Sequence, residues 1–184
     1  MEDAKHIELE KLITRLLVLI GEDPEREGLK KTPHRVAKWW TEFIEYDPGN
    51  TDATFESAST DQMVVVSGIK VWSLCEHHLL PFWAEVSVGY IPNKKVLGLS
   101  KFARVAHKAA HGLQIQERLV DDIASEIKKL TESKSIAVIA RGEHLCMTMR
   151  GIKTPGLMTT SKMTGAFMEE PEARAEFLSL VLTP

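Results

Sequence analysis

Hydrophobic side chains in the N-terminal part of the chain recur three or four positions apart. Between residues 7 and 20 this spacing predicts an amphipathic helix, which Gly21 ends. Thr32 is expected to cap a second helix in which Pro33 takes the first helical position. The Asp-Pro-Gly break at residues 47–49 ends that helix. The N-terminal part is therefore predicted to be a helical arm.

After a polar connector, residues 51–62, the pattern changes to short stretches typical of strands. We predict strands at residues 63–66, 69–74, 82–91, 135–141, 144–150 and 158–167, a tight turn at 142–143, and helices at 100–111, 115–130 and from 171 onwards. This order predicts an α+β fold with helices covering one face of an antiparallel sheet. The expected organisation is an arm at residues 1–50, the connector, and a main domain at residues 63–184.

The composition is average for a compact protein and narrows the classes of function. The 184 residues include 43% hydrophobic and 27% charged side chains, with a net charge of −3. Without a basic surface we expect no nucleic-acid partner, and without a run of about 18 apolar residues we expect no membrane partner. The acidic N-terminus does not read as a signal peptide, so we expect a cytoplasmic protein with reduced thiols.

The densest group of chemically useful side chains is Cys-Glu-His-His at residues 75–78. Cys75 and His78, three positions apart, can both reach one ion from a turn, and thiolate with imidazole favours zinc over hard cations. Cys146 is the candidate third ligand, which leaves a fourth position for water, as in a catalytic zinc site. Two buried free cysteines beside surface histidines are the alternative, which spacing alone leaves open.

Two histidines accompany this group. His144 lies two residues before Cys146 in a predicted strand, so both side chains are expected on the same face. His77 is adjacent to His78. Two imidazoles near a metal-bound water suit general acid–base hydrolysis near neutral pH. The alternative is that one or both only bond to the backbone.

A second group of residues favours anions. Ser100 is expected to cap a helix that carries Lys101 and Arg104 in its first turn, where free N–H groups and cations attract phosphate. Arg150 is expected on the same strand face as Cys146. Taken singly, each of these cations is more often a solvated surface charge.

Gln116 and Glu117 begin the predicted helix at residues 115–130. A carboxylate there usually caps the helix or interacts with its dipole. It can also accept two N–H donors from a guanine edge. The pattern does not choose between these roles.

Five motifs, in chain order, resemble GTP cyclohydrolase I. They read CEHHLLPF at residues 75–82, GYIP at 89–92, GLSKFAR at 98–104, QIQERL at 114–119 and HLCMTMRG at 144–151. Residues 21–40 also look like that family's helical region. The chain departs from relatives at residues 111–113, where an arginine is frequent, and at Val120, where a threonine is frequent. Neither position touches the metal or acid–base residues.

The resemblance implies a fold, a reaction and an assembly. The fold is the tunnelling fold, whose sheets join around a ring, preceded by an N-terminal helical arm. The reaction opens the imidazole ring of GTP at C8 with water, releases formate, and recyclises the product to 7,8-dihydroneopterin triphosphate. This is the first step of a folate, biopterin or deazaguanine pathway, and the sequence does not choose among them. The usual assembly is two stacked pentamers with active sites at subunit interfaces.

By motif match, the resemblance also implies roles for individual residues. Cys75, His78 and Cys146 would be the zinc ligands, and His77 and His144 the acid–base residues. The implied contacts to GTP are Glu117 at the guanine edge, Gln116 near the reacting ring, Ser100 beside the ribose, and Lys101, Arg104, Arg150 and Arg35 on the triphosphate.

Two rival interpretations keep parts of this picture. A related tunnelling-fold enzyme would be a pteridine synthase, with a three-histidine zinc site, or a nitrile reductase, with a cysteine nucleophile. Both conflict with Cys75, His78 and Cys146 occurring together. A purely structural zinc site would normally have four protein ligands, and the sequence offers three.

Overall fold

The computed structural model describes residues 2–56 and 62–182, which fall into two compact units, Met1–Tyr46 and Asp47–Pro184. In the first unit, α1 (Glu2–Leu19) packs against α2 (Thr32–Ile44), with Leu17 and Ala37 buried. Both helices lie where the hydrophobic spacing predicts them. The predicted cap is wrong, because Thr32 is already helical and Lys31 occupies the N-cap position without a side-chain hydrogen bond.

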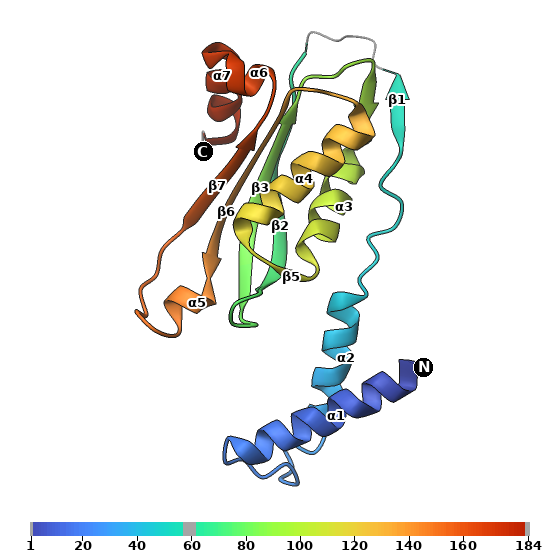
Figure 1. The fold of residues 1–184 in the computed structure, drawn as a ribbon, viewed down its shortest axis with the longest axis vertical. Helices are drawn as coiled ribbons and strands as arrows, with labels where there is room; N and C mark the ends of the chain where they lie inside the picture. The colour runs from blue at the N-terminus through green and yellow to red at the C-terminus, as the bar shows by residue number, and fades with distance from the viewer. Residues whose placement is uncertain (1, 57–61, 183–184) are drawn as a thin grey trace. The chain divides into compact units, whose positions relative to one another are not determined.

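The second unit is built on a five-stranded sheet in the order β5-β2-β3-β6-β7 (Figure 1). Its strands are β2 (Val64–Cys75), β3 (Pro81–Tyr90), β5 (Leu113–Gln114), β6 (Ile136–His144) and β7 (Met158–Met163). All neighbouring pairs are antiparallel except β2 with β5. A separate ribbon pairs β1 (Thr54–Glu56) with β4 (Lys95–Leu97). The predicted α+β class and the largely antiparallel sheet are confirmed.

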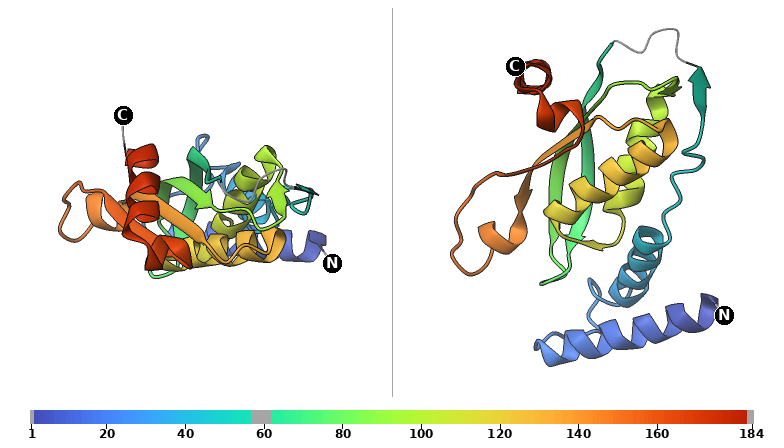
Figure 2. Two further views of the ribbon diagram at one scale, coloured as in Figure 1. Left: turned by 90° about the horizontal axis from the view of Figure 1, so that it is seen from above. Right: turned by 45° about the horizontal axis from the view of Figure 1, so that its top comes forward.

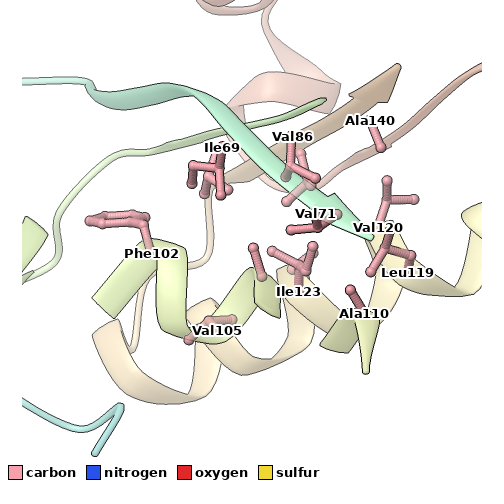
Figure 3. Packing of buried hydrophobic residues seen from close by; sticks show 14 of the residues in the cluster. Ile69, Val71, Val86, Phe102, Val105, Ala110, Leu119, Val120, Ile123 and Ala140 are labelled. Carbon is pink, nitrogen blue, oxygen red and sulfur yellow. The ribbon is translucent and has the colours of Figure 1, made fainter. Parts of the chain in front are cut away.

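Two helices, α3 (Leu99–Ala110) and α4 (Gln116–Thr131), cover one face of this sheet. Figure 3 shows the apolar layer between them. Val71 and Val86 project from β2 and β3 toward Phe102 of α3 and Leu119 and Ile123 of α4, and all five side chains are at most 1% exposed. Removing this apolar area from water is the main force that holds both helices on the sheet.

The prediction that all helices share one face is wrong. A separate apolar cluster joins Ala137 and Ile139 of β6 to Phe167 of α6 (Ala166–Glu169) and Phe177 of α7 (Pro171–Leu182). Successive residues of a strand point to opposite faces, so these two β6 residues belong to the face away from α3 and α4. Figure 2 shows α6 and α7 beside β7, apart from α4. The two C-terminal helices therefore cover part of the second face.

Near the candidate site, β6 departs from its prediction. It runs unbroken through Gly142 to His144, so the tight turn expected there is wrong. The glycine serves a close backbone approach instead, because a Cβ at position 142 would lie 2.1 Å from the carbonyl oxygen of Trp83 on β3. The strand predicted at residues 144–150 is also wrong. The short helix α5 (Leu145–Thr148) takes its place.

The strand directions fix which residues share an end of the sheet. Val64 pairs with Tyr90 at one end of the β2–β3 hairpin, and Cys75 lies at the other end, beside Gln114. Helix α3 begins shortly after β4 and ends just before β5, so its C-terminus lies at the Cys75 end (Figure 1). No helix in residues 2–56 and 62–182 is long and apolar enough to cross a membrane.

Candidate active site

Three potential metal ligands come together from distant parts of the chain. Cys75 is the last residue of β2, His78 lies in the turn that follows, and Cys146 is in α5. Their ligand atoms all lie within 4.8 Å of one another. The convergence predicted from the sequence is therefore present in the fold.

The turn between β2 and β3 holds two of these ligands on one side. The amide of Cys75 donates to the carbonyl of Leu80 at 2.8 Å, and the amides of His78 and Leu79 donate back to the carbonyl of Cys75 at 3.3 and 2.8 Å. Leu79 accommodates the reversal with a φ of 56°. As a result, Nδ1 of His78 lies 3.9 Å from Sγ of Cys75.

The electrostatics of the two thiols suit a cation. Burial, and then the neighbouring Cys75 thiol, raises the pKa of Cys146 to about 11, while Arg150 lowers it. Two adjacent thiolates are therefore unfavourable without a positive partner, and a divalent ion removes that penalty by binding the deprotonated sulfurs. Two sulfurs and an imidazole nitrogen are also the soft donor set that zinc accepts. Within the described residues, no fourth His, Cys, Asp or Glu joins this group.

His77 lies at the rim of this group. Its Nδ1 is 3.8 Å from Sγ of Cys75, and its Nε2 is 4.0 Å from a carboxylate oxygen of Glu76. The side chain is 63% exposed. An exposed imidazole at this distance is free to meet a ligand that enters from solvent.

His144 also lies beside the group, by a different route from the one predicted. It ends β6, and Cys146 follows in the first turn of α5, so the shared strand face expected for these two side chains is wrong. The imidazole stacks on Phe82 of β3, with ring centres 4.3 Å apart and an interplanar angle of 8°. Burial lowers the pKa of His144, and the carboxylate of Glu117 partly opposes this shift. The ring is consequently neutral near pH 7 and able to accept a proton.

Gln116 fixes the orientation of His144. Its side chain is fully buried, and its amide nitrogen donates to the carbonyls of Ala140 and Met158, both at 3.0 Å. The amide oxygen therefore faces Nε2 of His144, 3.0 Å away. That oxygen only accepts, so Nε2 carries the proton and Nδ1 is the unprotonated nitrogen of the neutral ring. Whether Gln116 also contacts substrate, as the resemblance implies, stays a prediction.

Replacing Gln116 with alanine should lower turnover about ten- to a hundred-fold, because the ring of His144 loses the partner that selects its tautomer. The bound metal should be retained. Nitrogen chemical shifts of the His144 ring in ¹⁵N-labelled protein should change from one tautomer to a mixture, an effect that a merely structural glutamine would not produce.

Gln114 provides the matched control for this substitution. It is also a buried glutamine, but its amide donates to Ala109 and Asp122 and does not reach His144. The Gln114→Ala variant should lose comparable stability while keeping the His144 shifts. If Gln114→Ala and Gln116→Ala changed those shifts equally, the positioning role would be wrong.

Arg150 reaches the site although its predicted strand does not exist. It lies in the segment after α5, and one of its guanidinium nitrogens is 2.6 Å from Nε2 of His78. Glu117 is an exposed residue in the first turn of α4, close enough to influence the titration of His144. These two predicted substrate contacts therefore lie with the metal-ligand group.

Sequence reasoning missed a support for the turn that carries the ligands. Arg118 of α4 contacts the carboxylate of Glu76 at 2.5 Å, the side-chain oxygen of Gln114 at 2.6 Å and the carbonyl of Leu113 at 2.8 Å. It thereby ties the start of α4 to the residue between Cys75 and His77. The four-residue spacing of Gln114 and Arg118 is the only sequence signal for this contact.

The cations of α3 do not join the ligand group within one chain. Ser100 is exposed and is not the cap, because α3 starts at Leu99 with Gly98 in the N-cap position. Lys101 donates to the carbonyl of Asn50 at 2.6 Å, and Arg104 donates to that of Pro48 at 2.5 Å.

These residues lie at the far end of a 12-residue helix, about 18 Å long, whose other end is beside Cys75. Arg35 is an exposed residue of α2 in the first unit. Ser100, Lys101 and Arg104 are thus not brought to the ligand group within a single chain.

Comparison with known proteins gives long matches. A family model described as GTP cyclohydrolase I matches residues 9–182. GTP cyclohydrolase 1 of Sulfurihydrogenibium sp. is 50% identical over 174 residues, covering 94% of this chain and 93% of that protein. The proteins of the same name from Aquifex aeolicus and Deinococcus radiodurans are 48% and 45% identical, covering 88% and 94% of this chain and 89% and 82% of their own lengths.

Proposed function

Because the chain belongs to the GTP cyclohydrolase I family, we infer that it converts GTP and water to 7,8-dihydroneopterin triphosphate and formate. The structural observation that carries this inference is the convergence of Cys75, His78 and Cys146 beside the oriented imidazole of His144. We further infer a cytoplasmic location, since thiols that serve as ligands must stay reduced.

The donor set fits zinc, and we propose that Cys75, His78 and Cys146 hold it. When bound there, zinc supplies Lewis acidity, which lowers the pKa of water toward neutrality. His144 then performs proton transfer: its neutral ring accepts a proton at Nδ1, and the resulting imidazolium can protonate a ring nitrogen of guanine as the bonds to C8 break. His77, exposed and with its Nδ1 3.8 Å from Sγ of Cys75, is the second group able to move a proton.

Glu117 is proposed to hold the guanine edge. Its carboxylate is exposed at the start of α4 and close to His144. Two carboxylate oxygens can accept the two N–H donors of that edge, which would place C8 toward the imidazole. Arg150, next to His78, supplies positive charge for the triphosphate, and such contacts remote from C8 help to position the ring.

We propose that a second copy of the chain completes the site. In the described residues, β7 pairs only with β6, and β2 has no partner on its outer side between Val64 and Ser73. Large apolar side chains also stay exposed, among them Trp72 and Ile152. Open sheet edges and exposed apolar surface are the features of a sheet that continues into another chain.

In such a ring, the start of α3 from one subunit can meet the ligand group of the next. Ser100, Lys101 and Arg104 would then bind the ribose and triphosphate, although a single chain keeps them at the opposite end of the sheet. We propose the tunnelling fold with two stacked pentamers as the assembly that achieves this, and Arg35 as a further contact to the triphosphate.

Mixing two inactive variants tests the shared site. Cys146→Ser subunits and Lys101→Ala/Arg104→Ala subunits, each inactive alone, should recover about one quarter of wild-type turnover when co-assembled in equal amounts. A site is active only if the subunit that supplies the metal ligands has an intact Cys146 and the neighbouring subunit has an intact Lys101 and Arg104. Each condition is met in about half of the cases, which gives about one quarter. Turnover is measured as formate release from complexes purified through a different tag on each variant.

Co-assembly of Cys146→Ser with Cys75→Ser is the matched control and should remain inactive, because both ligands belong to the same chain's group. If the first mixture also stayed inactive, the α3 cations would act within their own chain and the shared site would be wrong.

The proposed activity itself is tested by incubating the purified protein with GTP. We expect equimolar formate and a product that becomes a fluorescent pterin after oxidation, together with about one zinc ion per active site. Turnover of a pterin substrate instead, with no formate from GTP, would favour a related pteridine enzyme.

A further inference from the structure

Three potential metal ligands outside the candidate active site lie together in the first unit. His6 and Glu10 are one helical turn apart on α1, and His34 is in the first turn of α2. An oxygen of Glu10 is 3.0 Å from Nε2 of His6 and 2.7 Å from Nδ1 of His34, and these two nitrogens are 3.2 Å apart. The Glu10 oxygen and the two imidazole nitrogens are therefore close enough together to bind a single ion.

Two of these separations, 3.0 and 3.2 Å, match the geometry of donor atoms around a single ion, and the contact of 2.7 Å is shorter. Ligand atoms held about 2.1 Å from a first-row metal are roughly 3.0 Å apart at right angles and roughly 3.4 Å apart in a tetrahedron. Hydrogen bonding accounts for the arrangement less well. If both imidazoles donated to the same oxygen of Glu10, the N–H groups of His6 and His34 would converge on one another.

The surroundings leave room for a hydrated ion. The side chains of His6, Glu10 and His34 are 25%, 33% and 63% exposed, so water can complete the coordination. A metal here would not need to leave water entirely, and its ligands are already assembled.

We propose that His6, Glu10 and His34 form a second metal site, which takes a divalent first-row transition ion such as Zn²⁺ and links α1 to α2. Two imidazoles and one carboxylate on one side of an ion form the facial arrangement that such metals accept, whereas Mg²⁺ and Ca²⁺ prefer oxygen ligands. The ion stabilises the helical pair by mass action, since the three ligands lie apart in the unfolded chain.

The test measures zinc bound to the full-length protein after equilibrium dialysis against Zn²⁺. Wild type should bind about two ions per chain, and His6→Ala and Glu10→Gln should each bind about one. Glu8→Gln is the matched control, because Glu8 is an exposed carboxylate of α1 that pairs only with Lys11 among the described ion pairs. It should bind as wild type does.

Cobalt(II) substitution distinguishes the two sites. The ion at Cys75 and Cys146 should show a sulfur-to-metal charge-transfer band, whereas the ion at His6, Glu10 and His34 should show only d–d absorption. The Cys146→Ser variant should lose the sulfur-to-metal band but keep the d–d absorption of the ion at His6, Glu10 and His34. The test of the second site therefore does not depend on the proposed function. Binding that is unchanged in both His6→Ala and Glu10→Gln would overturn the proposal, whatever the total number of ions bound by wild type.

Discussion

Replacing Cys146 with serine should remove the metal bound beside Cys75 and lower GTP turnover at least about a thousand-fold. A serine hydroxyl stays protonated near neutral pH and is a poor substitute for a thiolate ligand. The loss of Lewis acidity amounts to several kcal/mol of barrier, and about 1.4 kcal/mol corresponds to a factor of ten. Cys146 is one of three converging candidate ligands, and no further His, Cys, Asp or Glu of the described residues joins them to take its place.

The fold should survive this substitution. Cys146 is only partly buried, at the edge of the apolar cluster, and serine has nearly the same shape. Elemental analysis should therefore show about one zinc ion per chain fewer than in wild type, in a protein with a cooperative thermal transition. Formate release from GTP measures the loss of turnover in the same preparation.

Met149→Leu is the control within the same segment. Met149 directly follows α5 and is 57% exposed, so this variant should keep both zinc and turnover. A Cys146→Ser protein that bound as much zinc as wild type would show that Cys146 is not a ligand. Full turnover by wild-type protein after metal depletion would contradict the metal requirement itself.

The ligand set could be predicted from the sequence because its residue types are rare and chemically distinctive. Cys75 and His78 lie within one turn, so their spacing alone brings them together. The helix α4 was equally accessible, since Leu119, Ile123 and Ile127 recur at helical spacing and all three are fully buried.

The segment from Gly142 to Arg150 could not be predicted in the same way. A glycine beside a charged residue is typical of a tight turn, but Gly142 is needed because β3 passes too close for a Cβ. In the following residues, apolar and polar side chains alternate well enough to suggest a strand. Four of these residues instead form the short helix α5. Short elements of this kind are decided by tertiary contacts, which local periodicity does not contain.

The position of the α3 cations was also beyond the sequence. Residue spacing says that Lys101 and Arg104 share a helical turn, but not at which end of the sheet the helix begins. The pairing of β2 with β3 and β5 decides this, and it puts the two cations far from Cys75 in one chain. In the proposed ring, their use in catalysis would depend on a second subunit, which a single sequence does not display.

Replacing His144 with alanine should keep the zinc and lower turnover about a hundred- to ten-thousand-fold. General acid–base transfer contributes about this much when one positioned side chain supplies it. His144 is suited to the role because Phe82 fixes the plane of its ring and Gln116 fixes its tautomer. Its nitrogens are not among the three converging ligand atoms, so the metal should remain.

Chemical rescue separates lost chemistry from lost packing. The deleted ring leaves space against Phe82, and added imidazole should restore part of the turnover of His144→Ala by supplying the missing base. His77→Ala is the comparison variant: it removes an exposed ring, so any loss of turnover there does not come from the core. Turnover is measured with and without imidazole at constant pH and ionic strength.

The zinc content of His144→Ala decides between two roles for this residue. If zinc and turnover fall together, His144 is a metal ligand, and the assignment of Cys75, His78 and Cys146 as the ligand set is wrong. If zinc stays and imidazole restores turnover, the ring acts on protons at its unprotonated Nδ1. The hydrogen bond from Nε2 to the buried amide of Gln116 favours the second result, because that contact leaves Nδ1 as the unprotonated nitrogen of the neutral ring.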